Sequence, residues 1–217
     1  MTSSFSPQSP RIGHAALVSI DPILPIPNLV VFQYNPDQLT RTIHPLIAPA
    51  DAEKGDVMRL RGPAQETIRM DGELDATDQL ENANGIATRL GILPQLSALE
   101  CMVYPKALVE ITNQVLSAIG MIEVIPTPMP LTILVWNVAR ILPVRLQDFT
   151  ITEEAFDTHL NPIRAKVTLN LRVLTYTDLG LFSVGRAIFM AHQVAKEALA
   201  AVSLASSVAS GIPLPGI

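Results

Sequence analysis

The chain has 217 residues, of which 48% are hydrophobic and 16% charged, with a net charge of −5 and a mean hydropathy of +0.33. A chain of this length can bury a substantial core, and its apolar composition predicts that some apolar surface lies in subunit contacts. The acidic balance argues against nucleic acid as a partner, because phosphate binding needs a concentrated basic patch. A single cysteine excludes an internal disulfide.

We divide the chain into three parts. We expect residues 1–14 to form a flexible arm. They lack the basic start and the apolar stretch of a secretory signal, so we expect the protein to be made in the cytoplasm. Residues 15–182 form the folded domain. Residues 183–217 predict an Ala-rich helical tail, whose stripe of mostly small side chains permits close helix packing. Packing on the domain or on a partner is favoured over a membrane, because the polar face of the tail is not strongly basic.

The first part of the domain predicts strands. Apolar runs at 15–21 and 29–36 are joined by a Pro-rich connection that cannot be helical. Asn35-Pro36 marks a turn, and Thr40 to Pro45 resumes extended structure. After an expected loop at 48–64, the next strand alternates strictly. Its apolar face holds Ile68, Met70, Gly72 and Leu74, and its polar face holds Arg69, Asp71, Glu73 and Asp75.

Helical periodicity replaces alternation between Thr77 and Gly120. We expect two helices here, and we expect Cys101 to be a buried structural thiol rather than a nucleophile. The apolar stripe of the first helix contains Leu96, Leu99 and Met102, and that of the second contains Leu108, Ile111, Val115 and Ile119. A following strand at 127–140 is apolar on both faces, which predicts a central strand or one packed against a neighbouring subunit.

Residues 141–176 specify an amphipathic strand pair. In the second strand the apolar face contains Ile163, Ala165, Val167, Leu169, Leu171 and Val173. In the first strand the apolar positions change from even to odd numbers between Leu146 and Phe149. One extra residue near Gln147 and Asp148 must be absorbed there, and a β-bulge is the simplest explanation. The expected fold class is α+β, mainly β.

The sequence offers little chemistry. No phosphate-binding, nucleophile or metalloprotease motif is present, and the four histidines, His14, His44, His159 and His192, have no metal-ligand spacing. Glu153, Glu154 and Asp157 precede His159, a group that could bind a cation or act as acid and base. Their place in a turn between strands favours a solvated loop. We therefore predict no catalytic residue, no metal site and no cofactor.

Oppositely charged side chains line two of the predicted strands. Arg164, Lys166 and Arg172 share the polar face of the last strand, whereas the earlier strand is mainly acidic. These faces could be solvated, could meet across subunits, or could line the interior of a closed ring. Charge complementarity of this kind sets register and partner choice more than affinity.

Four segments together resemble a known family. FQYNPDQLTR at 32–41, QETIRMDGELDA at 65–76, LPQLSALE at 93–100 and ILPVRLQDFTITEEAFDTHLNPIRAKVTLNLRVL at 141–174 are similar to tube-like baseplate proteins of contractile injection systems, which are phage-tail-like particles. The resemblance spans about residues 15–180, with its motifs in the expected order. It implies a tube-protein-like β-barrel or sandwich with inserted helices. Relatives often carry a LysM domain, which nothing after residue 180 resembles.

The resemblance also implies a function. The chain would be a structural protein, not an enzyme, that forms a hexameric ring between spike and inner tube and acts as a tube initiator. Its partners would be further copies of itself, the inner tube protein, the spike or hub protein and other baseplate subunits, with no nucleic acid and no membrane. It would lie in the bacterial cytoplasm within the assembled particle or be released with it. The alternatives are an inner-tube or tube-cap subunit, and a monomeric ligand-binding β-barrel.

Overall fold

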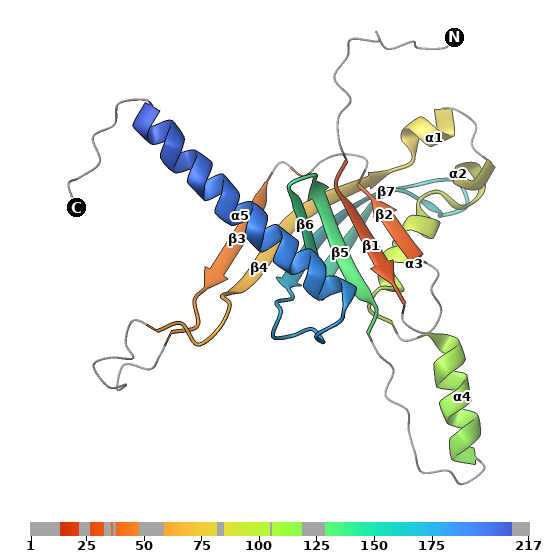
Figure 1. The fold of residues 1–217 in the computed structure, drawn as a ribbon. Helices are drawn as coiled ribbons and strands as arrows, with labels where there is room; N and C mark the ends of the chain where they lie inside the picture. Colours follow the sequence, from red (N-terminus) through yellow and green to blue (C-terminus); the bar gives the residue numbers. More distant parts are fainter. Residues whose placement is uncertain are drawn as a thin grey trace.

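The computed structural model describes residues 14–21, 27–32, 36, 38–47, 59–81, 85–104, 106–118 and 129–209. These residues form one antiparallel sheet of seven strands and five helices, which confirms the predicted α+β, mainly β class (Figure 1). The strands are β1 (Ala16–Ile20), β2 (Pro27–Val31), β3 (Leu39–His44), β4 (Gln65–Asp75), β5 (Leu131–Asn137), β6 (Arg140–Phe156) and β7 (Pro162–Val173). The helices are α1 (Thr77–Glu81), α2 (Gly85–Leu90), α3 (Leu93–Glu100), α4 (Ala107–Ala118) and α5 (Val184–Ala209).

The sheet is open. Its strand order is β2-β1-β5-β6-β7-β4-β3, so that β2 and β3 are the two edges. The barrel closure expected from the family resemblance is therefore absent from the described part of the chain. Strand β5 lies between β1 and β6, in agreement with the prediction that a strand apolar on both faces is internal.

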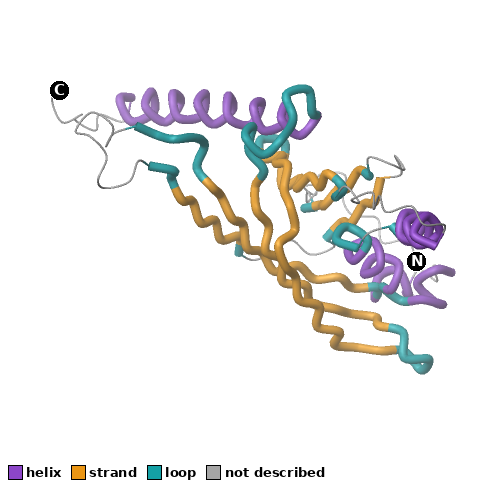
Figure 2. The backbone as a smooth tube through the Cα atoms, turned by 90° about the horizontal axis from the view of Figure 1, so that it is seen from below, coloured by secondary structure: helices purple, strands orange, loops and turns teal. Residues whose placement is uncertain are grey.

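Strand lengths differ strongly across the sheet. Strands β4, β6 and β7 have 11, 17 and 12 residues, whereas β1 and β2 have five each. Figure 2 shows α5 at one end of the long strands, and the β6–β7 hairpin continuing at the far end. The register between β6 and β7 shifts between Leu146 and Asp148, which confirms the predicted bulge. Two further shifts follow at 153–156, where the sequence shows no break in parity clear enough to predict them.

The core follows the predicted alternation. The inward side chains of β4 and β7 are buried, including Ile68, Met70, Leu169 and Leu171. Helix α3 adds Leu96 and Leu99 to the same cluster and packs on β2.

Two of the family-like segments meet inside this core. Phe32 is fully buried, and a Cβ atom on Gly72 would lie 2.5 Å from its ring. Gly72 therefore leaves the space that the aromatic ring fills. Residues 33–35 and 37 of the first segment, together with residues 1–13, 48–58 and 119–128, lie outside the described residues.

Three sequence-based expectations about the helices need correction. The described residues from Thr77 to Ala118 form four helices, α1 to α4, and not the two that were expected. Cys101 follows the last residue of α3 and is exposed, not buried, because the helical period places it off the face shared by Leu96 and Leu99. Helix α4 has the predicted apolar stripe, but Leu108, Ile111 and Val115 are all exposed. A helical period shows which side chains share a face, and it does not show whether that face is covered.

Candidate assembly surfaces

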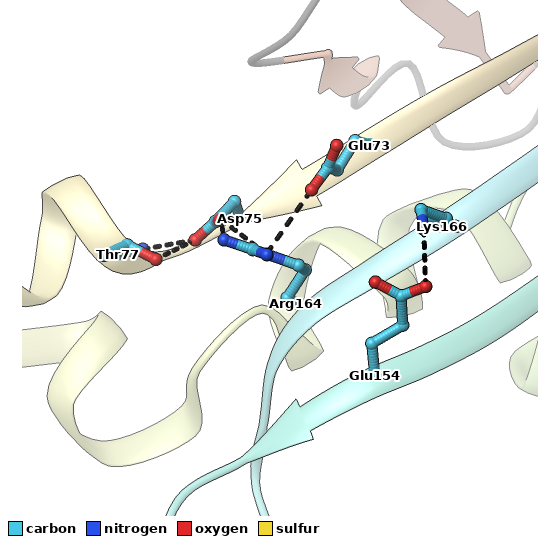
Figure 3. A network of polar contacts seen from close by, with 6 residues as sticks. All are labelled: Glu73, Asp75, Thr77, Glu154, Arg164 and Lys166. Carbon is cyan, nitrogen blue, oxygen red and sulfur yellow. Dashed lines mark hydrogen bonds and ion pairs between the residues drawn. The ribbon is translucent and has the colours of Figure 1, made fainter.

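Strands β4 and β7 bring the two charged faces together within one chain. Their register places Asp75 opposite Arg164 and Glu73 opposite Lys166. The guanidinium group of Arg164 donates to Asp75 Oδ2 from Nε at 2.8 Å and lies 3.4 Å from Glu73 Oε1 (Figure 3). The hypothesis that these faces meet across subunits is therefore wrong for this pair, because their charges are already matched inside the subunit.

Asp75 also joins the sheet to α1. Its Oδ1 atom accepts hydrogen bonds from the backbone N–H and the hydroxyl group of Thr77. Burial alone would raise the pKa of the Asp75 carboxyl, but the bonds from Thr77 and Arg164 hold this pKa below its usual range. The carboxylate is therefore a structural anchor at the end of β4.

The network continues onto β6. Lys166 Nζ lies 2.7 Å from Glu154 Oε1, so that charged side chains alternate across β4, β7 and β6 (Figure 3). Arg172 pairs with Asp178 at 3.0 Å at the other end of β7. All three basic residues predicted on the polar face of β7 thus have acidic partners in the same chain. The pairs of Arg164 and Lys166 join neighbouring strands and favour their observed register, although the exposed pair of Lys166 and Glu154 adds little stability.

The acidic group near His159 is only partly in a turn, because Glu153 and Glu154 belong to strand β6 and the expected loop is wrong for them, whereas Asp157 lies in the turn as predicted. Asp157 Oδ1 accepts hydrogen bonds from the backbone N–H groups of His159 at 2.7 Å and Asn161 at 2.8 Å. The side chain of Asn161 donates to Asp157 Oδ2, and these bonds lower the pKa of the Asp157 carboxyl. Glu154 points to Lys166 instead. Among the described residues, no three His, Cys, Asp or Glu side chains are grouped in a way that could hold a metal ion.

Hydrogen bonds join this turn to α2 and to the residue before α3. The Asn161 side chain donates to the carbonyl of Arg89, and the backbone N–H of Ile92 donates to the carbonyl of Pro162 at 2.9 Å. Gly91 adopts φ +56°, and a Cβ atom there would lie 2.0 Å from the Pro162 oxygen. Only glycine fits this contact, which fastens the far end of the β6–β7 hairpin.

A second charged cluster lies beneath α5, and the sequence analysis did not predict it. Glu66 is buried and accepts a hydrogen bond of 2.6 Å from Arg41, and Lys196 of α5 lies 3.7 Å from its other oxygen. His192 Nδ1 lies 3.2 Å from the carbonyl of Ala139. The only signal in the sequence is that Glu66 has the parity of the buried residues of its strand.

The pKa values in this cluster follow from burial and charge. Burial would raise the pKa of Glu66, but Arg41, with help from Lys196, lowers it below the usual value. Burial and the neighbouring charge of Lys196 lower the pKa of His192. The cluster therefore favours an ionised Glu66 and a neutral His192 near neutral pH.

An open hollow of ≈ 430 Å³ lies beside this cluster. It lies between α5 and the β3–β4 region, and its lining includes Ile43, Leu60, Phe189 and Met190. The alternative of a ligand-binding barrel requires a closed sheet around its ligand, whereas the described sheet ends at β2 and β3. The hollow is a surface feature next to the β3 edge.

Exposed apolar side chains gather on the edges and on two helices. Strand β2 exposes Leu29 and Val31, and β3 exposes Ile43. Helices α4 and α5 contribute Leu108, Ile111, Val115, Leu199, Val202 and Leu204. In the described part of the chain, no helix combines the length and the hydropathy needed to cross a membrane.

Comparisons with known proteins do not assign this chain to a family. No protein family and no curated protein match the chain. Among solved structures, a chain of the anti-feeding prophage (AFP) baseplate, determined by cryo-EM with 6-fold symmetry applied, is 13% identical. The match covers 76% of this chain and 93% of that chain, with a TM-score of 0.26. A likeness of this degree carries no argument about this chain.

Proposed function

We propose that this protein is a structural subunit of a contractile injection system, which forms a hexameric ring in the baseplate, adapts the spike to the inner tube and initiates tube assembly. The observation that carries the proposal is the open sheet, whose two edges, β2 and β3, lie at opposite ends of the strand order. Within the described residues, each of these strands has a sheet neighbour on one side only, and each exposes apolar side chains.

An edge of this kind is stable when another strand covers it. If β3 of one copy pairs with β2 of the next, every edge is covered once the ring closes. The sequence segments that resemble tube-like baseplate proteins support the same conclusion, because they form the core contact between Phe32 and Gly72 and the long strands of the sheet.

The polar residues fit a structural role. Glu154, Asp157 and Arg164 are engaged in ion pairs and turn hydrogen bonds that hold the strands in register. A subunit of this kind acts through its geometry. It passes the symmetry of the spike to the tube and presents a surface on which the first tube ring assembles.

The test is the mass of the purified protein, alone and mixed with candidate tube and spike proteins, measured by light scattering with negative-stain imaging. We expect six-fold rings, or stacks of rings, in the mixture. Binding to the tube protein without the spike would assign the chain to the tube or its cap. A monomer that ignores both partners would contradict the proposal.

Edge variants make the test specific. Leu29→Lys on β2 and Ile43→Lys on β3 place a charge on the edges, and we expect both to abolish ring formation. Val138→Lys is the matched control, because Val138 is 98% exposed in the β5–β6 turn, away from both edges. Rings formed equally well by all three variants would exclude edge pairing.

A further inference from the structure

Helix α5 leaves the sheet halfway along its length. Its last ion pair to the sheet joins Lys196 to Glu66, and Glu66 lies opposite Ile43 on the edge strand β3. Every residue from 197 to 206 is exposed. Figure 1 shows this half of the helix projecting past β3. The projection is therefore a continuation of the β3 edge of the molecule.

The projecting half has the composition of a buried helix. Residues 198–206 contain no charged side chain, and Leu199 and Val202 remain 58% and 63% exposed. These two residues and Leu204 lie among alanines and serines around the helix. A helix that is apolar on most of its circumference is normally covered by protein, and small side chains allow a second helix to approach closely.

A matching surface lies at the other end of the sheet. Helix α4 exposes Leu108, Ile111 and Val115, which are spaced to share one face. The helix is placed near the β1–β2 end of the sheet, because Lys106, next to its start, lies 4.0 Å from Asp21 at the end of β1. Figure 1 shows α4 and the end of α5 on opposite sides of the molecule, so the two surfaces cannot meet within one chain.

We propose that the projecting half of α5 in one copy packs against the apolar face of α4 in the next copy, beside the contact between their β3 and β2 edges. The inference rests on the proposed ring and assigns its contact surfaces. Two different patches at opposite ends of one subunit make a head-to-tail contact, which generates a ring when the rotation closes.

The size of the helices favours a combined contact. At 1.5 Å per residue, α4 is about 18 Å long and the exposed part of α5 about 15 Å. Such a helix pair alone buries less than the roughly 800 Å² per partner of a stable interface. The strand edges, whose exposed apolar residues include Leu29 and Ile43, would add to the contact.

Two charge substitutions test the contact. Val202→Asp blocks the α5 surface and Ile111→Asp blocks the α4 surface, both at exposed positions where the fold tolerates a polar side chain. Circular dichroism should show unchanged folding. With the tube and spike proteins present, we expect both variants to lose ring formation, while Val138→Asp assembles like the unaltered protein.

Mixing the two variants tests whether α5 of one copy contacts α4 of another. The Val202→Asp chain keeps its α4 surface and the Ile111→Asp chain keeps its α5 surface, so the mixture should form one heterodimer with twice the subunit mass. A mixture that stays monomeric, or Ile111→Asp chains that assemble alone, would overturn the α5-to-α4 contact. If both variants form rings, the helix contact is wrong and the ring remains. If even the unaltered chain never joins a ring, the proposed function itself fails.

Discussion

The two halves of α5 both carry apolar side chains, but their surroundings differ. In the first half, Phe189 and His192 are buried against the sheet, and Lys196 is paired with Glu66. In the second half, Leu199 and Val202 are exposed. The difference shows that the contacts which hold this helix on the sheet come from its first half, whereas the apolar side chains described in its second half are exposed.

The largest effect should come from removing the main anchor of the held half. Phe189→Ala should lower the free energy of unfolding by about 3 kcal/mol, because Phe189 is 7% exposed and packs edge-to-face on Tyr176 at 6.1 Å. Urea unfolding measures the loss. Met190→Ala is the control, since Met190 is 43% exposed, and its cost should stay below about 1 kcal/mol. Equal losses would mean that α5 is not anchored through Phe189.

Gly91 tests whether the far end of the sheet is held as firmly as the first half of α5. Gly91→Ala should cost about 2 kcal/mol, because it combines φ +56° with a contact of 2.0 Å to the Pro162 oxygen. Gly85→Ala is the matched control, because nothing lies within 4 Å of its Cβ position and alanine favours the helix. Thermal unfolding of both variants decides the question, and similar melting temperatures would argue against the tight contact.

The charged cluster under α5 should make stability depend on pH. The pKa of His192 is lower in the folded protein than its usual value of 6.5, so the unfolded chain binds more protons and stability falls as the pH drops below about 6.5. The pKa of Glu66 is also lowered, so its contribution is present above 4.5 and is lost as the pH falls further.

Two variants separate these contributions. His192→Gln should flatten the pH dependence of the unfolding free energy just below pH 6.5, and Glu66→Gln should flatten it below pH 4.5. Chemical unfolding at a series of pH values measures both. An unchanged pH profile in His192→Gln would show that the imidazole group is not desolvated under α5.

The smallest effect belongs to the projecting half. Val202→Ala should change the unfolding free energy of the isolated subunit by less than about 0.5 kcal/mol, because its side chain has few contacts within the chain and alanine is the better helix former. The same chemical unfolding assay measures it. A loss near that of Phe189→Ala would show that the end of α5 packs within the single chain.

Much of the sheet could be predicted from local patterns. The alternation over Ile163 to Val173 identified the buried face of β7, and the change of parity near Gln147 identified the bulge in β6. Both are local signals, since successive side chains of a strand point to opposite faces. The turn at Asp157 was likewise predicted, because its acceptor atoms act on residues two and four positions away.

The candidate surfaces were harder to predict. The sequence showed the charged faces of β4 and β7 but left open whether they meet inside one chain. It also gave α4 its apolar stripe without showing that the stripe is exposed, and it gave no reason to link Glu66 with Lys196. Each of these depends on which elements become neighbours.

Sequence alone determined the class of the fold, the parity of its long strands and the resemblance that supports the proposed function. The tertiary structure decided that the sheet stays open, that Arg164 finds Asp75 89 positions away, and that half of α5 projects from the sheet. The reason is physical. Periodicity reports the geometry of one element, whereas the partner of a face or a charge is set by contacts between residues far apart in the chain.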